Sequence, residues 1–494
     1  MLDPTATERR FAALQERLQT VASLDSPVER TVVALPSLNF GDELLARHDM
    51  PSYEQRWLYL LFMLRRPWMR VVFVSSDAVP EQEVEYLLEL GGAPGDARER
   101  LTMISVDDLS LRALAVKLLD RPDLLERIRG LAATDGSFIV PFNVREAERD
   151  VALALDVPIY GIDHRFARYG TKSGGRRLFE EEGVPCPAGA QPVSGVGDLV
   201  PAIRRLRAAH PALEAVVVKL DDSVFGEGNV IVSLRDLPPA GTTREAVALD
   251  LRLRSLAPAY LADLRAGGGV VEELVGDGEV RSPSVQVRIL PDGEPVVLSS
   301  HDQVLGGAQG HAFVGARFPA DRAYGRAIVS EAGKVGRRLT REGVVGRFGV
   351  DFVVGTGETE QDARPYAVEI NLREGGTSHP FGALWLLTDG HFDPATTRYR
   401  TARGEERHYF CTDALGDPAY RGVDWRELVA EAAGRGLAYD PADEAGVVLF
   451  MLRALAREGR VGLVAIAATP DEAQEFYLGV VALLDELRGR TDRR

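Results

Sequence analysis

Two neighbouring segments decide the fold around which the chain is organised: Arg347–Val354, R-F-G-V-D-F-V-V, and Ala367–Arg373, A-V-E-I-N-L-R. In the second segment, apolar and polar residues alternate with the period of a strand. This period places three polar side chains on one strand face: Glu369, Asn371 and Arg373. Asp351 lies among apolar residues in the first segment, and burying such carboxylates without partners is costly. Oxygen ligands of this kind suit Mg²⁺, and edge-strand carboxylates that face solvent are the alternative.

A second candidate site follows a strand that ends in a lysine. Ala215–Val232 reads A-V-V-V-K-L-D-D-S-V-F-G-E-G-N-V-I-V, a buried strand, a loop and a second strand. The loop glycines, Gly226 and Gly228, allow backbone N–H groups to approach phosphate oxygens, whose charge Lys219 neutralises. A hairpin with turn glycines and a surface lysine is the alternative. Further along, Gly268–Val275 (G-G-V-V-E-E-L-V) predicts a strand ending in two acids, where an adenine edge could meet the backbone; solvated acids are the alternative.

Taken in order, these segments resemble the ATP-grasp ligase superfamily. The series consists of Lys172 upstream of G-V-P-C-P, Lys219 with its glycine loop, E-E-L-V, F-G-V-D-F and E-I-N-L-R, and it covers residues 171–387. The resemblance implies an ATP molecule held between two α+β lobes. It also implies roles for individual residues: phosphate contacts from Lys172 and Lys219, adenine contacts from Glu272, Glu273, Leu274 and Val275, and Mg²⁺ coordination by Asp351, Glu369 and Asn371.

Within the superfamily, the chain is similar to the pheganomycin-type peptide ligases, which join a small-molecule or amino-acid carboxylate to a peptide amine. The similarity rests on Glu369–Pro380, E-I-N-L-R-E-G-G-T-S-H-P, and on Gly459–Ile466, G-R-V-G-L-V-A-I. Two positions depart from the superfamily pattern. The usual ribose-binding acid is missing, which leaves Glu279 as a candidate, and Gly349 stands where many members have an arginine. The candidates for steadying an acyl-phosphate are three other arginines: Arg373, Arg288 and Arg347.

Hydrophobic patterning divides the chain into three regions. In residues 1–170, β-branched runs alternate with amphipathic helices, which indicates a parallel sheet covered on both faces and resembles the superfamily's N-terminal domain. Residues 171–387 are expected to form a two-lobed catalytic core with mainly antiparallel strands, and residues 388–494 a small C-terminal α/β domain. The predicted class is therefore mixed α/β and α+β with an ATP-grasp fold. The predicted elements include a strand at Pro158–Tyr160 and a helix over Arg244–Arg265.

Composition limits the class of protein. The 494 residues carry a net charge of −16 without a long basic run, which argues against nucleic-acid and anionic-membrane partners. No apolar stretch approaches the ~20 residues of a membrane span, and the N-terminus lacks a signal-peptide pattern, so we expect a cytoplasmic protein. Two isolated cysteines match neither a disulfide framework nor a zinc site. Lysine accounts for only four of the 58 basic residues, so the chain strongly prefers arginine. A position that nevertheless holds lysine, such as Lys172 or Lys219, is therefore a better candidate for a site that needs a compact ammonium group.

Together these features predict an ATP-dependent carboxylate–amine ligase. ATP and Mg²⁺ are the expected cofactors, and a small-molecule or amino-acid carboxylate and an amine or peptide are the expected substrates; a homodimer is left open. The carboxylate would attack the terminal phosphate of ATP, and the amine would attack the resulting acyl-phosphate. Gly306–Gly310 and Gly375–Ser378 are candidate covers over that intermediate. A non-catalytic nucleotide-binding module and a phosphotransferase that stops at the phosphorylated carboxylate are the alternatives.

Overall fold

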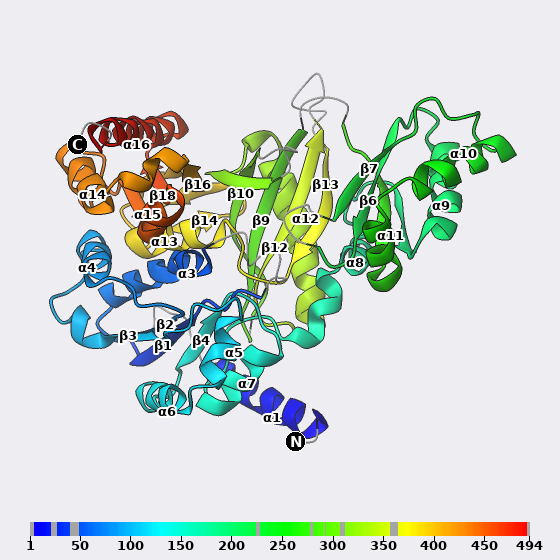
Figure 1. The fold of residues 1–494 in the computed structure, drawn as a ribbon. Coiled ribbons are helices and arrows are strands. Elements are labelled where there is room, and N and C mark those ends of the chain that lie inside the picture. Colours follow the sequence, from blue (N-terminus) through cyan, green and yellow to red (C-terminus); the bar gives the residue numbers. More distant parts are fainter. Residues whose placement is uncertain are drawn as a thin grey trace.

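A computed structural model of the chain describes residues 4–20, 27–39, 49–223, 228–276, 280–291, 293–306, 312–355 and 364–491. Within these residues, three sheets of four or more strands follow one another along the chain, from blue at the N-terminus to red at the C-terminus (Figure 1). The predicted mixed α/β and α+β class is confirmed. In the described part of the chain, no helix is long and apolar enough to cross a membrane.

The first sheet is parallel, as its apolar runs predict. Its strands lie in the order β3-β2-β1-β4. Helices cover both faces, so alternate residues enter different apolar clusters: Val32 and Phe73 pack on one face, Val33 and Val72 on the other. The strands are β1 (Arg30–Leu35), β2 (Met69–Ser75), β3 (Leu101–Ser105) and β4 (Phe138–Pro141). The helices are α1 (Pro4–Glu16), η1 (Arg17–Thr20), α3 (Met50–Glu54), η2 (Gln55–Arg65), α4 (Glu81–Leu90), η3 (Ala97–Arg100), α5 (Leu114–Leu119), α6 (Pro122–Leu131), α7 (Glu146–Leu155) and η4 (His164–Gly170).

Two predicted elements are wrong. Residues 158–160 make a single parallel bridge, from Ile139 to Ile159, instead of a strand, because the chain bends directly afterwards. The predicted helix Arg244–Arg265 is interrupted before Pro258, whose ring and missing N–H are tolerated in the first turn of a helix but not in its interior. The segment therefore forms two helices, α10 (Thr243–Arg254) and α11 (Pro258–Gly267).

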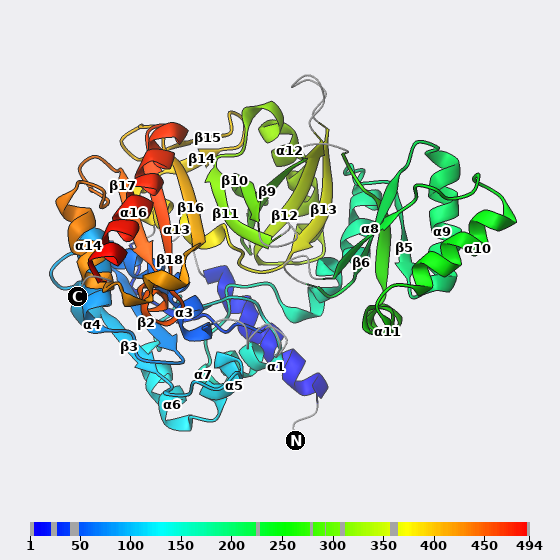
Figure 2. The same ribbon diagram turned by 45° about the horizontal axis from the view of Figure 1, so that its top comes forward.

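The second sheet is small and antiparallel, with strand order β5-β8-β6-β7. Its apolar face packs on the surrounding helices through a cluster that includes Val216, Val218 and Leu249. In Figures 1 and 2 this unit, in green, projects from the side of the molecule next to β13. Its elements are α8 (Lys172–Glu182), β5 (Gly189–Val193), α9 (Val196–Ala209), β6 (Ala215–Leu220), β7 (Asn229–Ser233) and β8 (Gly269–Glu273), together with α10 and α11.

The third sheet forms the centre of the molecule (Figure 2). In the described residues it has eight antiparallel strands in the order β13-β12-β9-β10-β11-β16-β18-β17. Strands β16 to β18 come from the region predicted as a C-terminal domain, so that region extends the sheet of the core; the boundary at residue 387 stays a prediction. The strands are β9 (Val280–Ile289), β10 (Val296–Gly306), β11 (Ala312–Phe318), β12 (Gly346–Gly355), β13 (Pro365–Asn371), β16 (His408–Gly416), β17 (Gly446–Phe450) and β18 (Arg460–Ala467).

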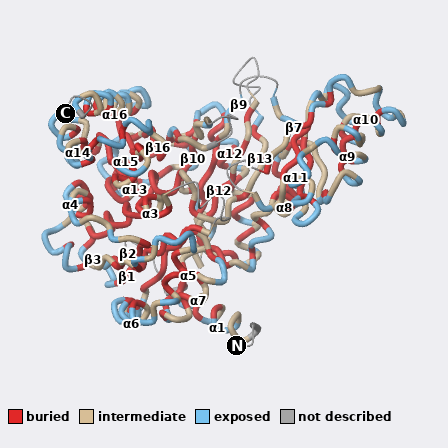
Figure 3. Tube along the Cα trace, viewed as in Figure 1, coloured by how far each residue is buried: buried red, intermediate tan, exposed pale blue. Residues whose placement is uncertain are grey.

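Helices on opposite faces bury this central sheet. α12 (Arg322–Arg341) packs against β9 and β10, where Gly336 allows it to approach Val287. α13 (Ser378–Thr388) lies on the other face, with the rings of Phe381 and Phe318 5.7 Å apart. Its Gly382 stands against Tyr59 of η2, where a Cβ atom would come within 2.4 Å of the ring. Figure 3 accordingly shows α13 and the strands as buried, while α6, α10 and α16 (Pro470–Thr491) expose much of their length.

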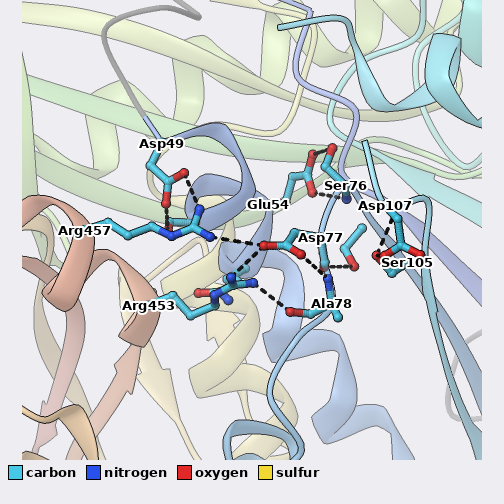
Figure 4. A network of polar contacts seen from close by, with 12 residues as sticks. Asp49, Glu54, Ser76, Asp77, Ala78, Ser105, Asp107, Arg453 and Arg457 are labelled. Carbon is cyan, nitrogen blue, oxygen red and sulfur yellow. Dashed lines mark hydrogen bonds and ion pairs between the residues drawn. The ribbon is translucent and has the colours of Figure 1, made fainter. Parts of the chain in front are cut away.

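Polar contacts join the N-terminal sheet to the C-terminal region (Figure 4). Arg453 Nη2 lies 2.6 Å from Asp77 Oδ2, and Arg457 Nη1 lies 2.8 Å from Asp49 Oδ1. Burial opposes ionisation of Asp77, but the two arginines hold the pKa of Asp77 below its usual value. These contacts tie the segments before α3 and after β2 to the C-terminal region, and η2, which follows α3, packs against α13. The remaining elements are β14 (His391–Asp393), β15 (Arg398–Arg400), η6 (Pro418–Gly422), α14 (Trp425–Gly434) and α15 (Leu452–Glu458).

Candidate functional site

Three strands of the central sheet place the predicted metal and arginine residues in three rows. Residues paired across β9, β12 and β13 share a sheet face, and every second residue along a strand returns to it, about 7 Å further on. The first row contains Ser284, Asp351 and Glu369; the second contains Gln286, Gly349 and Asn371; the third contains Arg288 and Arg347. Arg373 follows two residues after Asn371, just beyond the end of β13. Arg288 and Arg347 therefore lie at the opposite end of one short polar strip from the carboxylates, whereas Arg373 interacts electrostatically with Asp351 and Glu369.

The first row brings two carboxylates together. Asp351 and Glu369 are direct cross-strand partners. Asn371 Nδ2 donates a hydrogen bond to Asp351 Oδ2 at 2.9 Å, and Lys172 Nζ, from the start of α8, donates to Glu369 Oε1 at 2.8 Å. Burial and the Glu369 carboxylate raise the pKa of Asp351 well above its usual range, although Arg373 and Lys172 oppose this. Ionisation of Asp351 beside Glu369 is therefore unfavourable unless a further cation is bound.

A hard divalent cation fits this donor set. A cation between two opposed carboxylates offsets their mutual repulsion, and carboxylate and amide oxygens are ligands that Mg²⁺ prefers. Among the described residues, no group of three or more His, Cys, Asp or Glu side chains could hold a metal. The candidate magnesium site thus consists of Asp351, Glu369 and the amide of Asn371, a small set that suits an ion completing its shell with phosphate oxygens and water.

Arg373 is the predicted arginine that interacts electrostatically with both carboxylates. It lines a small cavity with Asn143 and Phe142 of the loop after β4, and its guanidinium lies 5.5 Å from the centre of the Phe142 ring. Burial lowers the pKa of Arg373 below its usual value, while the charges of Glu369 and Asp351 oppose the change. The side chain is thus a desolvated cation that acts on the carboxylate row at close range.

The other two predicted arginines have different surroundings. Arg347 Nη1 lies 3.7 Å from Glu374 Oε1. Burial alone would lower the pKa of Arg347, but Glu374 and the hydroxyl groups of Tyr59 and Tyr160 hold it above its usual value. Arg288 is paired with Arg347 across the strands, and both line a second, larger cavity. Arg347 also lines the cavity that contains Arg373.

Sequence reasoning missed Gln286, which stands in the row between the carboxylates and the arginines. Its Nε2 donates a hydrogen bond to Thr377 Oγ1 at 3.0 Å. A Cβ atom on Gly349 would come within 2.9 Å of this nitrogen, so Gln286 lies over the glycine that stands where many superfamily members have an arginine. The alternating sequence S-V-Q-V-R at 284–288 could have revealed Gln286, because the period of a strand puts it on the same face as Arg288.

Of the two glycine-rich segments predicted to cover the intermediate, Gly375–Ser378 lies wholly within the described residues. In Gly375–Ser378, the backbone N–H of Gly375 donates to Ser378 Oγ at 2.8 Å, and Glu374 N–H donates to the backbone oxygen of Phe142 at 2.9 Å. This segment is a closed turn tied to β9 and to the N-terminal sheet. Of Gly306–Gly310, only Gly306 belongs to the described residues.

Lys219 lies in a separate, buried ion cluster on the small sheet. Its Nζ donates to Glu272 Oε2 at 2.6 Å, and Arg176 Nη1 donates to Glu272 Oε1 at 2.9 Å. Glu272 thus uses both oxygens to hold cations. The loop after β6 reaches back to the first row, because Ser223 presents its backbone oxygen to Lys172 Nζ at 3.2 Å.

The predicted adenine segment connects the small sheet to the central one. Glu273 accepts a hydrogen bond from the Ala188 N–H at 2.7 Å, and the Leu274 N–H donates to Ala215 O at 3.2 Å. Val275 follows and leads toward β9. Gly228 closes the turn between β6 and β7, where a Cβ atom would come within 2.4 Å of Ser223. Two other predicted residues, Gly226 and Glu279, lie outside the described residues.

Sequence comparisons identify relatives along most of the chain. The L-propargylglycine–L-glutamate ligase of Streptantibioticus cattleyicolor is 31% identical over 465 residues, which cover 92% of this chain and 94% of that protein. IQ motif-containing protein H of Danio rerio is 22% identical over 448 residues, which cover 80% of this chain and 42% of that protein. The family model "IQCH-like, ATP-grasp" matches residues 257–395, and "PGM1 C-terminal domain" matches residues 427–480.

Solved structures share the fold at low sequence identity. The biotin carboxylase domain of Hydrogenobacter thermophilus 2-oxoglutarate carboxylase is 12% identical, with a TM-score of 0.53 over 92% of this chain and 90% of that one. An ADP complex of N5-carboxyaminoimidazole ribonucleotide synthetase is 12% identical, with a TM-score of 0.50 over 93% and 98%. The predicted ATP-grasp fold is confirmed. With a 31% identical ligase matching nearly its whole length, the chain belongs to the ATP-grasp ligases, among the carboxylate–amine ligases of the pheganomycin type.

Proposed function

We propose that this chain joins the carboxylate of one amino acid or small acid to the amine of an amino acid or peptide, converting ATP to ADP and phosphate. The ligase from Streptantibioticus cattleyicolor is named for L-propargylglycine and L-glutamate, and the length of its match supports amino-acid substrates. The observation that carries the proposal is the polar strip of three rows. It offers carboxylates for a metal–phosphate group and, within electrostatic range of them, the Arg373 guanidinium for a second anion.

In this proposal, each polar cluster binds one part of the nucleotide. Asp351, Glu369 and Asn371 would hold Mg²⁺, which when bound neutralises phosphate charge. Lys172 contributes an ammonium group beside Glu369, and Lys219 contributes a second on the small sheet. The backbone of the segment 273–275 connects the two sheets and would meet the adenine edge.

The reaction proceeds in two steps, and Arg373 stabilises the negative charge of the intermediate between them. A carboxylate oxygen of the first substrate attacks the terminal phosphorus of ATP, the bond to ADP breaks, and an acyl-phosphate forms. Arg373 lies beside the carboxylate row and on the ring of Phe142, where it steadies the negative charge of this acyl-phosphate. The amine nitrogen of the second substrate then attacks the acyl carbon and loses a proton, and phosphate leaves with one former carboxylate oxygen.

ADP release from a matrix of substrates tests the proposal. The purified full chain is given MgATP with amino acids singly and in pairs, beginning with L-glutamate and neutral amino acids, and products are identified by mass. Amide formation is expected to match ADP release one to one and to require both substrates. ADP formed at full rate with a carboxylate alone would indicate a phosphotransferase. Nucleotide binding without ADP release for any pair would indicate a non-catalytic module.

A further inference from the structure

A second cavity, of about 780 Å³, lies beside the arginine row. It is bounded by the end of η2, the start of β10, α13 and the start of β14. Arg347 lines both this cavity and the small one that contains Arg373. Because the row of Gln286 separates the carboxylates from Arg347, the cavity lies beyond the arginines and away from the candidate magnesium site. Its volume is that of a small-molecule binding site.

Positive charge dominates the wall of this cavity. The charged groups among the described residues that line it are four arginines and one aspartate: Arg65, Arg66, Arg288, Arg347 and Asp389. Asp389 is shared, with Arg66 Nη2 2.9 Å from Oδ1 and Arg65 Nη1 3.4 Å from Oδ2. Among the described residues that line the cavity, guanidinium groups therefore outnumber carboxylates. A wall of this kind attracts an anion, and guanidinium groups bind carboxylate, sulfonate or phosphate oxygens with charge-assisted hydrogen bonds.

Aromatic side chains line another part of the wall and suit a planar or apolar body. Trp68, Trp385 and Phe381 line the cavity. The Arg66 guanidinium lies 5.6 Å from the centre of the Trp385 ring, so charge and a flat apolar surface occur side by side.

We propose that this cavity is a second binding site, for an organic anion with a planar or apolar body, separate from the nucleotide site. The anion contacts the guanidinium groups and the body lies between the aromatic walls. This inference does not depend on the proposed reaction, because it rests on the wall of the cavity alone.

The fluorescent anion 8-anilinonaphthalene-1-sulfonate is a suitable probe, because two of the four tryptophans line the cavity and transfer excitation to a bound dye. We expect one saturable site on the full chain that MgATP does not displace. Arg66→Gln should weaken binding at least about tenfold, the loss typical of one charge-assisted hydrogen bond. Arg165→Gln is the matched control and should leave binding unchanged. Arg165 also pairs with an aspartate, Asp163 at 3.3 Å, and lies over an aromatic ring, Phe166 at 4.7 Å.

Three results would overturn the proposal: the absence of a saturable site, displacement of the dye by MgATP, or equal weakening in the two arginine variants. If Arg66→Gln does not fold, Trp385→Phe replaces it. This variant keeps an aromatic wall, so the dye should bind with near-native affinity but with reduced energy transfer from tryptophan. Undiminished transfer would locate the dye elsewhere and would equally overturn the proposal. Because dye binding is measured without turnover, failure here leaves the proposed ligation untouched.

Discussion

At the scale of single residues, the partly buried carboxylates of Asp351 and Glu369 are cross-strand partners, and their repulsion lowers stability unless a cation joins them. Asp351→Asn removes one charge and keeps the shape of the side chain. We expect ligation to fall at least about 100-fold, because a metal–phosphate contact of the transition state is lost. The melting temperature should stay level or rise, because the repulsion is relieved. ADP release and calorimetry measure the two effects.

The control for this variant is Asp302→Asn, which alters another partly buried acid of the same sheet. Asp302 accepts a hydrogen bond from Tyr324 and lies away from the three rows. Its substitution should lower stability and leave turnover within a few-fold of the parent. Retention of comparable activity by Asp351→Asn would mean that Asp351 holds no metal.

Arg373 gives a second prediction at this scale. Arg373→Ala should leave nucleotide affinity within a few-fold and lower amide formation by ~3 kcal/mol, or about 100-fold, the usual effect of deleting one well-placed donor to developing negative charge. The physical reason is that this desolvated guanidinium lies beside the carboxylate row. Nucleotide binding and single-turnover ligation are measured separately. Near-normal ligation would assign Arg373 to packing on Phe142.

At the scale of elements, β9 and β12 pack closely where the Gln286 side chain lies over Gly349, its cross-strand partner. Gly349→Ala would bring a methyl group within 2.9 Å of Gln286 Nε2 and push it away from Thr377. We expect a loss of about 1–3 kcal/mol of unfolding free energy, as in other overpacked sites, and slower ligation. In a Gln286→Ala background, the same substitution should cost much less, because its steric partner is gone. Additive losses in denaturant titrations would show that the two residues do not interact.

The sequence was most informative where periodicity and local signals agree. The alternating polar residues of β13 predicted that Glu369 and Asn371 share a face, and their pairing with Asp351 and Gly349 of β12 agrees with this. Pairing between distant segments was not predictable. β16 adds to the central sheet through β11, and no local pattern encodes which edge accepts it. Gln286 was overlooked for a related reason, since its importance comes from the glycine opposite it on another strand.

At the scale of the whole molecule, buried acids make stability depend on pH. Glu54 lies between the N-terminal sheet and the C-terminal region and accepts hydrogen bonds from Ser76 N at 2.7 Å and Ser76 Oγ at 2.6 Å (Figure 4). Burial nevertheless raises the pKa of Glu54 from 4.5 to about 7. Between these values the folded chain binds a proton that the unfolded chain has lost. Stability contributed by this group is therefore highest below pH 4.5, falls as pH rises to about 7, and is constant above that.

Glu54→Gln should remove this group's share of the pH dependence, at most about 1.4 kcal/mol per pH unit between pH 5 and 7. Urea unfolding at pH 5, 6, 7 and 8 measures the slope. Glu83 also has a pKa raised to about 7 by burial, so part of the dependence should remain in the variant. Glu85→Gln, an exposed acid on α4, is the control and should keep the full slope. Equal slopes in the two variants would show that Glu54 is ionised throughout this range.

Transfer of an oxygen atom from the carboxylate to phosphate is the direct signature of ligation through an acyl-phosphate. The full chain is given MgATP, an amine substrate and a carboxylic acid labelled with ¹⁸O in both carboxylate oxygens. We predict one ¹⁸O atom in each phosphate released and one in each amide, because the attacking oxygen leaves with phosphorus. Unlabelled phosphate, or label recovered in AMP, would contradict carboxylate attack on the terminal phosphate of ATP.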